Sequence, residues 1–118
     1  MKLSLNKGSW AAVLLLASPL SAADLPVFRI AIKDHKFSPR TLTVPSGQKF
    51  KLIVSNEDAE PAEFESFVLH REQVIVGKSQ GTVFLGPLKT GSYEFFDDFH
   101  STVRGTIEAA APASAEKK

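Results

Sequence analysis

The sequence contains no cysteine, and its single methionine and single tryptophan, Met1 and Trp10, both lie close to the start of the chain. Disulfide bonds, iron–sulfur clusters and cysteine-bound zinc sites are therefore excluded, because each of them needs cysteine sulfur. A type 1 copper centre is excluded too, since it needs a thiolate and usually a weak thioether beside its histidines. Apart from Met1, the chain offers a metal ion only oxygen and nitrogen donors.

The charge balance has no strong sign. Lys and Arg number 14 against 13 Asp and Glu, which gives a formal net charge of +1. That balance gives no reason to expect a nucleic-acid partner or an anionic membrane surface. The sequence also lacks a nucleophile elbow and a glycine-rich phosphate loop, and its three histidines are too few for a multi-imidazole oxidase. A binding protein is therefore the main expectation, rather than an enzyme.

The first 23 residues have the pattern of a secretory signal peptide. Lys2 and Lys7 precede an apolar run over residues 10–20, and Ser21-Ala22-Ala23 supplies small residues before a cleavage point. This run is too short to span a bilayer, which takes ~20 apolar residues, so we expect a periplasmic protein that is not embedded in the membrane. Residues 24–108 are expected to form one domain, and the Ala-rich, Pro-containing segment 109–118 is expected to be a disordered tail.

Hydrophobic residues alternate with polar ones along most of the remaining chain. Phe28, Ile30 and Ile32 alternate with Arg29 and Lys33, and a period of two is typical of half-buried strands. Turn-forming segments rich in Pro, Gly, Asn and Asp separate the candidate strands. The pattern predicts an all-β, Greek-key β-sandwich of about seven strands. They cover residues 28–33, 41–44, 49–54, 73–76, 82–85, 93–96 and 103–108. Residues 61–72 form the one segment that could be helical.

Five motifs follow one another over residues 27–108. They are Phe37-Ser38-Pro39-x-x-Leu42-x-Val44-Pro45-x-Gly47, Leu52-x-Val54-x-Asn56, Glu63-Phe64-Glu65-Ser66, Gly86-Pro87-Leu88-x-x-Gly91-x-Tyr93-x-Phe95-Phe96 and Phe99-His100. In this order they resemble the EfeO-type cupredoxin-like family. This family is similar to the cupredoxin domain of EfeO and to small periplasmic FtrB-like cupredoxins that accompany ferrous-iron permeases.

The resemblance implies a changed ligand set. Glu63 stands where ordinary cupredoxins have their first ligand histidine, Asp97 falls on the cysteine position, and His100 falls on the second histidine. Val103 lies near the methionine position. The family further implies an iron or copper ion as cofactor, with a membrane iron permease or a periplasmic partner subunit receiving the metal.

Side-chain direction limits which acids can share an ion with His100. If Glu63-Phe64-Glu65 is extended, both carboxylates lie on one face; if it is helical, they diverge. The same alternation pairs Asp98 with His100 and points Asp97 away, whereas the family position of the cysteine favours Asp97. We therefore expect a site of Glu63, Glu65, Asp98 and His100, with Asp97 as the alternative acid. His35 is a further candidate ligand if the first strand ends near the site.

Carboxylates with one imidazole form a hard, anionic site that suits iron, manganese or Cu(II). Several carboxylates also favour Fe(III) over Fe(II), so oxidation of incoming ferrous iron is chemically reasonable. The competing hypothesis is a metal-free adaptor that uses its loops only for protein contacts. Convergence of the four groups within ~5 Å would favour the metal site, because a bound ion needs all of its ligands within coordination reach.

Overall fold

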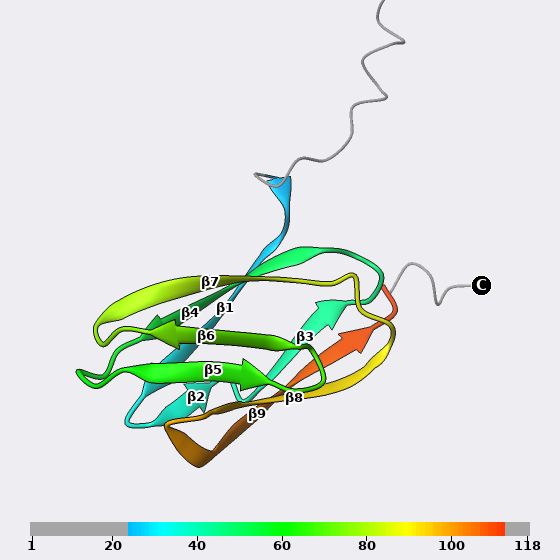
Figure 1. The fold of residues 1–118 in the computed structure, drawn as a ribbon. Coiled ribbons are helices and arrows are strands. Elements are labelled where there is room, and N and C mark those ends of the chain that lie inside the picture. Colours follow the sequence, from blue (N-terminus) through cyan, green and yellow to red (C-terminus); the bar gives the residue numbers. More distant parts are fainter. Residues whose placement is uncertain (1–23, 113–118) are drawn as a thin grey trace, which may run out of the picture.

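The computed structural model describes residues 24–112, which fold into nine strands and two facing sheets (Figure 1). The strands are β1 (Val27–Lys33), β2 (Lys36–Ser38), β3 (Thr41–Pro45), β4 (Phe50–Asn56), β5 (Ala62–Ser66), β6 (Arg71–Ile75), β7 (Ser79–Leu85), β8 (Gly91–Asp97) and β9 (His100–Ala110). The predicted signal peptide, residues 1–23, lies outside the described residues. Among residues 24–112, no helix is long and apolar enough to cross a membrane.

One sheet has four strands in the order β2-β1-β4-β7, and the other has five in the order β3-β9-β8-β5-β6. The pairs β1–β4 and β3–β9 are parallel, and the remaining pairs are antiparallel. The predicted all-β sandwich is confirmed. The predicted strand number was too low, because β2 and β5 were not recognised.

The segment that could have been helical is instead strand, turn and strand. Within residues 61–72, β5 precedes a turn at residues 67–70, and β6 then begins at Arg71. Phe64 is fully buried in the core, and β5 is paired on both sides, with β6 and β8. Tertiary pairing therefore decides the conformation of a segment whose local propensity is ambiguous.

Strand β9 extends two residues past the predicted end of the domain at residue 108. Strand β9 continues to Ala110, the Ala110 carbonyl accepts a hydrogen bond from Ser46 N at 2.9 Å, and Ala109 is buried opposite Val44 of β3. The sequence analysis expected a disordered tail from residue 109 because this segment has no large apolar side chain. The small side chain of Ala109 is nevertheless buried. Residues 113–118 of the predicted tail lie outside the described part of the chain.

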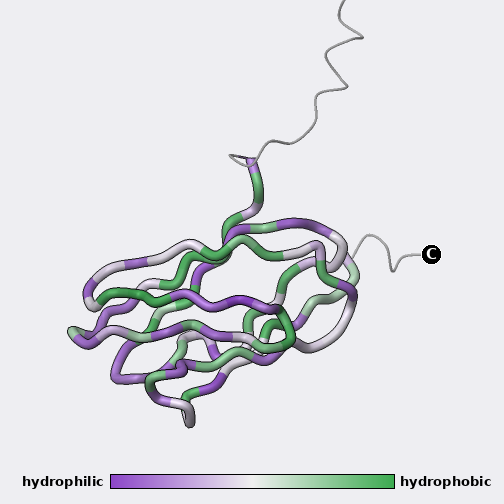
Figure 2. Tube along the Cα trace, in the orientation of Figure 1, coloured by the Kyte–Doolittle hydropathy of each residue, from purple (hydrophilic) through white to green (hydrophobic). Residues whose placement is uncertain are grey.

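Aromatic rings fill much of the space between the sheets. Phe95 lies 5.1 Å from Phe64 and 4.8 Å from Phe37 between ring centroids, and all three rings are buried. Figure 2 shows hydrophobic and hydrophilic positions interleaved along the strands. It also shows that the start of β6 is hydrophilic and that the hydrophobic residues 74–76 follow. The core between the two sheets is made of aliphatic and aromatic side chains.

Candidate metal centre

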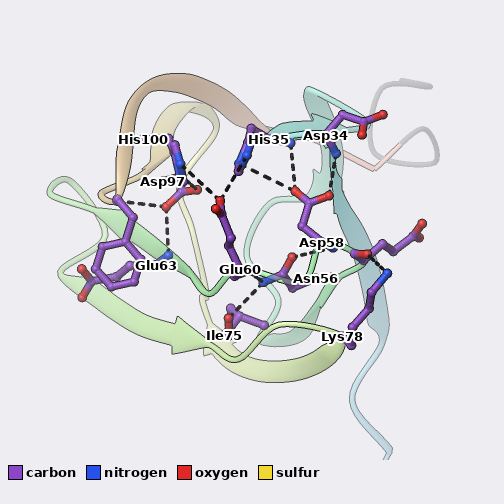
Figure 3. A network of polar contacts seen from close by, with 12 residues as sticks. Asp34, His35, Asn56, Asp58, Glu60, Glu63, Ile75, Lys78, Asp97 and His100 are labelled. Carbon is purple, nitrogen blue, oxygen red and sulfur yellow. Dashed lines mark hydrogen bonds and ion pairs between the residues drawn. The ribbon is translucent and has the colours of Figure 1, made fainter.

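Two histidines and one glutamate come together where three loops meet. His35 follows β1, Glu60 lies in the loop between β4 and β5, and His100 is the first residue of β9. Glu60 Oε1 lies 3.4 Å from His35 Nε2 and 4.0 Å from His100 Nε2, and the two imidazole centroids are 4.1 Å apart (Figure 3). Each of the three residues offers a donor atom within 4.8 Å of the others. We call these three residues the imidazole cluster.

Asp58 and Asn56 fix the position of His35. Asp34 and His35 have positive φ angles, and their backbone N–H groups donate to the Asp58 carboxylate at 2.7 and 2.9 Å. The hydrogen bond from the His35 backbone, followed by the one from Asp34, lowers the pKa of Asp58. Asn56 is buried; its Oδ1 accepts from Asp58 N, and its Nδ2 donates to the carbonyls of Glu60 and Ile75. A buried amide thus shapes the loop that presents Asp58 and Glu60.

Asp97 performs the same task for His100. Its carboxylate is 1% exposed, and Oδ1 accepts hydrogen bonds from Glu63 N at 2.9 Å and Phe99 N at 3.0 Å. The other oxygen lies 3.2 Å from His100 Nδ1. Because a carboxylate is an acceptor, it favours the tautomer with hydrogen on Nδ1, which leaves the Nε2 lone pair facing Glu60. A carboxylate behind a ligating histidine is the usual outer partner of such a residue.

The donor set decides which metals fit. Two imidazoles and one carboxylate, with positions left open, are the combination typical of non-haem Fe(II) sites, and imidazole also suits copper and zinc. The set does not fit type 1 copper, because the chain has no cysteine to supply a thiolate. The exposed side-chain fractions of His35, His100 and Glu60 are 44%, 35% and 67%, so the cluster is accessible from solvent.

A second group of acids lies on β5 and β6. Glu63, Glu65 and Glu72 each offer a carboxylate oxygen within 4.8 Å of the others. Burial is the main cause that raises the pKa of Glu63 to about 7, followed by a hydrogen bond with Glu72 and by the charges of Glu72, Asp98 and Glu65. The pKa of Glu65 is raised as well, by burial and by the charges of Glu72 and Asp98. We call Glu63, Glu65 and Glu72 the acid cluster.

The structure therefore divides the ligand set that the sequence predicted. Glu63 and Glu65 do share one face of an extended β5, with Phe64 buried on the other, as the extended alternative required. They group with Glu72, however, and not with His100. His100 meets Asp97, the alternative acid, at 3.2 Å, and the register of β8 and β9 is irregular between Phe96 and Asp97. Asp98, the acid that was expected to pair with His100, contributes its charge to the acid cluster.

Sequence reasoning did not assign a site role to Glu60 or to the two residues that support its loop, Asn56 and Asp58. Asn56 was noted only as part of a family motif, and Asp58 and Glu60 lie in a segment whose composition indicated a turn. The alternation of Asn56, Asp58 and Glu60 was the available signal, since three polar side chains two residues apart can point to one side of an extended segment. His35, which Asp58 and Glu60 contact, was predicted only in part. It was a candidate ligand if the first strand ended near the site, and β1 ends two residues earlier, at Lys33.

The chain belongs to the cupredoxin-like domain family, whose model matches residues 8–109. It is 46% identical over 80 residues to the uncharacterized protein RP394 of Rickettsia prowazekii strain Madrid E, across 67% of this chain and 64% of that protein. It is also 31% identical over 102 residues to the iron uptake system component EfeO of Yersinia pseudotuberculosis serotype I. That match covers 82% of this chain but only 26% of EfeO.

Solved structures share the fold at low sequence identity. Amicyanin from Paracoccus versutus matches with a TM-score of 0.57 and 19% identity, over 79% of this chain and 92% of amicyanin. The metal-binding domain of the Cu(I)-exporting P-type ATPase CopA of Streptococcus pneumoniae D39, solved with Cu(I), matches with a TM-score of 0.59 and 14% identity, over 71% of this chain and 84% of that domain. These matches establish a cupredoxin fold for the chain.

Proposed function

We propose that this protein binds ferrous iron at the imidazole cluster and supplies it to a membrane iron-uptake system from outside the cytoplasm. The observation that carries the proposal is the convergence of His35, Glu60 and His100, with Asp97 holding one imidazole from behind. Two imidazoles and a carboxylate provide the donor types that Fe(II) accepts, at a place that solvent can reach. The name of the EfeO relative supports iron as the cargo, and the cupredoxin-like domain is consistent with an extracytoplasmic protein.

Copper is the second metal that the site would take. Divalent affinity generally peaks at Cu(II) among the first-row metals, so Cu(II) should bind the same nitrogen and oxygen donors in solution. Binding of copper by the purified protein is therefore expected whichever metal is the cargo, and competition under reducing, anaerobic conditions is the more informative measurement.

The test is anaerobic calorimetry with Fe(II) on the parent and on substituted chains. His35→Ala and His100→Ala should each weaken binding by ~10-fold or more, equal to ~1.4 kcal/mol, because a small ligand set rarely compensates for a lost member. The matched control is Glu63→Gln with Glu65→Gln, which removes two carboxylates outside the imidazole cluster and should change the affinity by less than ~3-fold.

The opposite result assigns the metal to the acid cluster, which is the second candidate site because it also offers three donor atoms within 4.8 Å. If the parent chain binds neither Fe(II) nor Cu(II), the metal-free adaptor becomes the better hypothesis. Its supporting observation is the exposure of Phe67 and Val68, which are 70% and 58% accessible and would suit a partner surface.

A further inference from the structure

A cleft of about 370 Å³ lies beside the imidazole cluster. It is bordered by β2 and by the first half of β9, and His35 belongs both to the cleft and to the cluster. A molecule in this cleft would therefore lie next to an ion held by the cluster. Its size is within the ~300–1,000 Å³ that is typical of small-molecule sites. The lining residues are His35, Lys36, Phe37, Arg40, Thr102, Val103 and Arg104.

Cationic side chains dominate the polar lining. Arg104 is already engaged, since its guanidinium pairs with Glu94 at 3.1 Å and lies 5.0 Å from the centroid of the Phe96 ring. Lys36 and Arg40 are exposed, and within residues 24–112 neither of them forms an ion pair with an acidic side chain. Their charges are therefore available to an anion in the cleft.

The imidazole cluster needs further donors to complete a coordination shell. It supplies three donor atoms, and a site with two imidazoles and one carboxylate leaves positions open on an iron(II) ion. The donors that iron accepts at such positions include carboxylate oxygens. An anionic ligand in the adjacent cleft could coordinate the metal ion with one oxygen and pair its remaining charge with Lys36 and Arg40.

We propose that the protein binds its metal ion together with a small polycarboxylate chelator, whose free carboxylate lies in the cleft against Lys36 and Arg40. This inference rests on the proposed function, because it needs an ion at the imidazole cluster. Arg40 can hold a carboxylate through two parallel N–H donors, and Lys36 adds a point charge, so the cleft favours an anion with more than one carboxylate.

The experiment uses the full chain loaded with Co(II), a redox-stable stand-in whose visible spectrum reports its coordination. Citrate is the probe, and equilibrium dialysis measures its retention by metal-loaded and metal-free protein. We expect one citrate per bound Co(II), a change in the Co(II) spectrum on addition of citrate, and little retention without metal. Lys36→Ala with Arg40→Ala should weaken citrate binding by ~10-fold while changing Co(II) affinity in the absence of citrate by less than ~3-fold.

The matched control is Lys49→Ala with Lys89→Ala, which removes the same charge from exposed positions just before β4 and in the loop between β7 and β8. Citrate binding that is equal in the cleft variant and the parent overturns the inference, as does an equal loss in the control or removal of Co(II) by citrate without a ternary complex. In each of these cases Co(II) binding without citrate leaves the proposed function intact. If Co(II) does not bind to the parent at all, the proposed function fails and the ternary complex fails with it.

Discussion

The imidazole cluster and the acid cluster use carboxylates in opposite ways. Around the imidazole cluster, Asp58 and Asp97 accept hydrogen bonds from backbone N–H groups and lie behind the Nδ1 atoms of His35 and His100, at 3.8 and 3.2 Å. In the acid cluster, the carboxylates face one another across β5 and β6. The pKa of Asp58 is lowered, whereas the pKa of Glu63 is raised to about 7.

Glu63 connects the two environments. Its backbone N–H donates to the Asp97 carboxylate on one side, and its side chain belongs to the acid cluster on the other. The comparison teaches that the number of acids in a region does not by itself define a metal site. A carboxylate that accepts hydrogen bonds from N–H groups can orient a neighbouring imidazole. Carboxylates that lie close together in a buried place instead hold a proton more tightly.

The largest expected effect comes from removing Asn56, the amide that shapes the loop of the imidazole cluster. Asn56→Ala leaves the carbonyls of Glu60 and Ile75 and the N–H of Asp58 without this partner in a buried place. We expect a loss of about 2–4 kcal/mol in the free energy of unfolding, measured by denaturant titration. Ser55→Ala, one residue earlier on β4, is the control. An equal effect at both positions would contradict the role given to the amide.

The next largest effect tests whether Asp97 orients His100. In Asp97→Asn the amide N–H₂ group can face Nδ1 and favour hydrogen on Nε2, the atom that would hold the metal. We expect metal affinity to fall by ~10–100-fold, the usual cost of losing such an outer partner, with a matching change in the ¹⁵N shifts of the ring. Asp98→Asn is the control, because this neighbouring acid contributes charge to the acid cluster instead. A larger loss with Asp98→Asn would restore Asp98 as the ligand.

The sandwich was predictable because hydrophobic and polar residues alternate along most of its strands, and the hydrophobic ones are the buried ones. Ile30, Ile32, Leu52 and Val54 are all buried, at the spacing that the sequence pattern indicated. Strand β5 was not predictable in the same way, since its central acids, Glu63 and Glu65, interrupt the pattern expected for a strand in the middle of a sheet. Only its pairing with β6 and β8, which is a tertiary property, makes it a strand.

The site was predictable in its residue types and not in its grouping. Absence of cysteine directed attention to carboxylates and imidazoles, and His35 and His100 were both candidates before the fold was known. Their meeting depends on left-handed backbone at Asp34 and His35 and on the irregularity between Phe96 and Asp97. An alternation argument assumes regular strands, so it could not anticipate that Asp97, and not Asp98, meets His100.

Copper provides a spectroscopic version of the same comparison. Cu(II) bound at the imidazole cluster should show nitrogen hyperfine structure from two imidazoles in its electron paramagnetic resonance spectrum, whereas Cu(II) at the acid cluster would show oxygen coordination. An intense blue thiolate band is expected at neither cluster, since the chain has no cysteine. His35→Ala with His100→Ala should remove the nitrogen signal. Its persistence in this variant would place the copper elsewhere.

The smallest expected effect is a pH dependence of stability that arises from Glu63. The pKa of this group is raised from 4.5 to about 7 in the folded protein, so the folded state binds its proton more tightly than the unfolded chain does. The stabilisation by this proton is therefore fully present below pH 4.5 and is lost as the pH rises through about 7. Glu63→Gln, which is neutral at every pH, should flatten this part of the stability profile in thermal melts and be the more stable chain on the alkaline side.

Exposed Glu57→Gln is the control for that measurement, because it removes one carboxylate outside the acid cluster. Its profile should keep the slope of the parent. An unchanged slope in Glu63→Gln would mean that the carboxylates of the acid cluster are all ionised near neutral pH, as they would be if a cation bound there and offset their repulsion. The pH profile therefore bears on the metal assignment as well. If Glu63 keeps its raised pKa when Fe(II) is added, while Fe(II) binding still depends on His35 and His100, the acid cluster is a proton site and the imidazole cluster is the metal site.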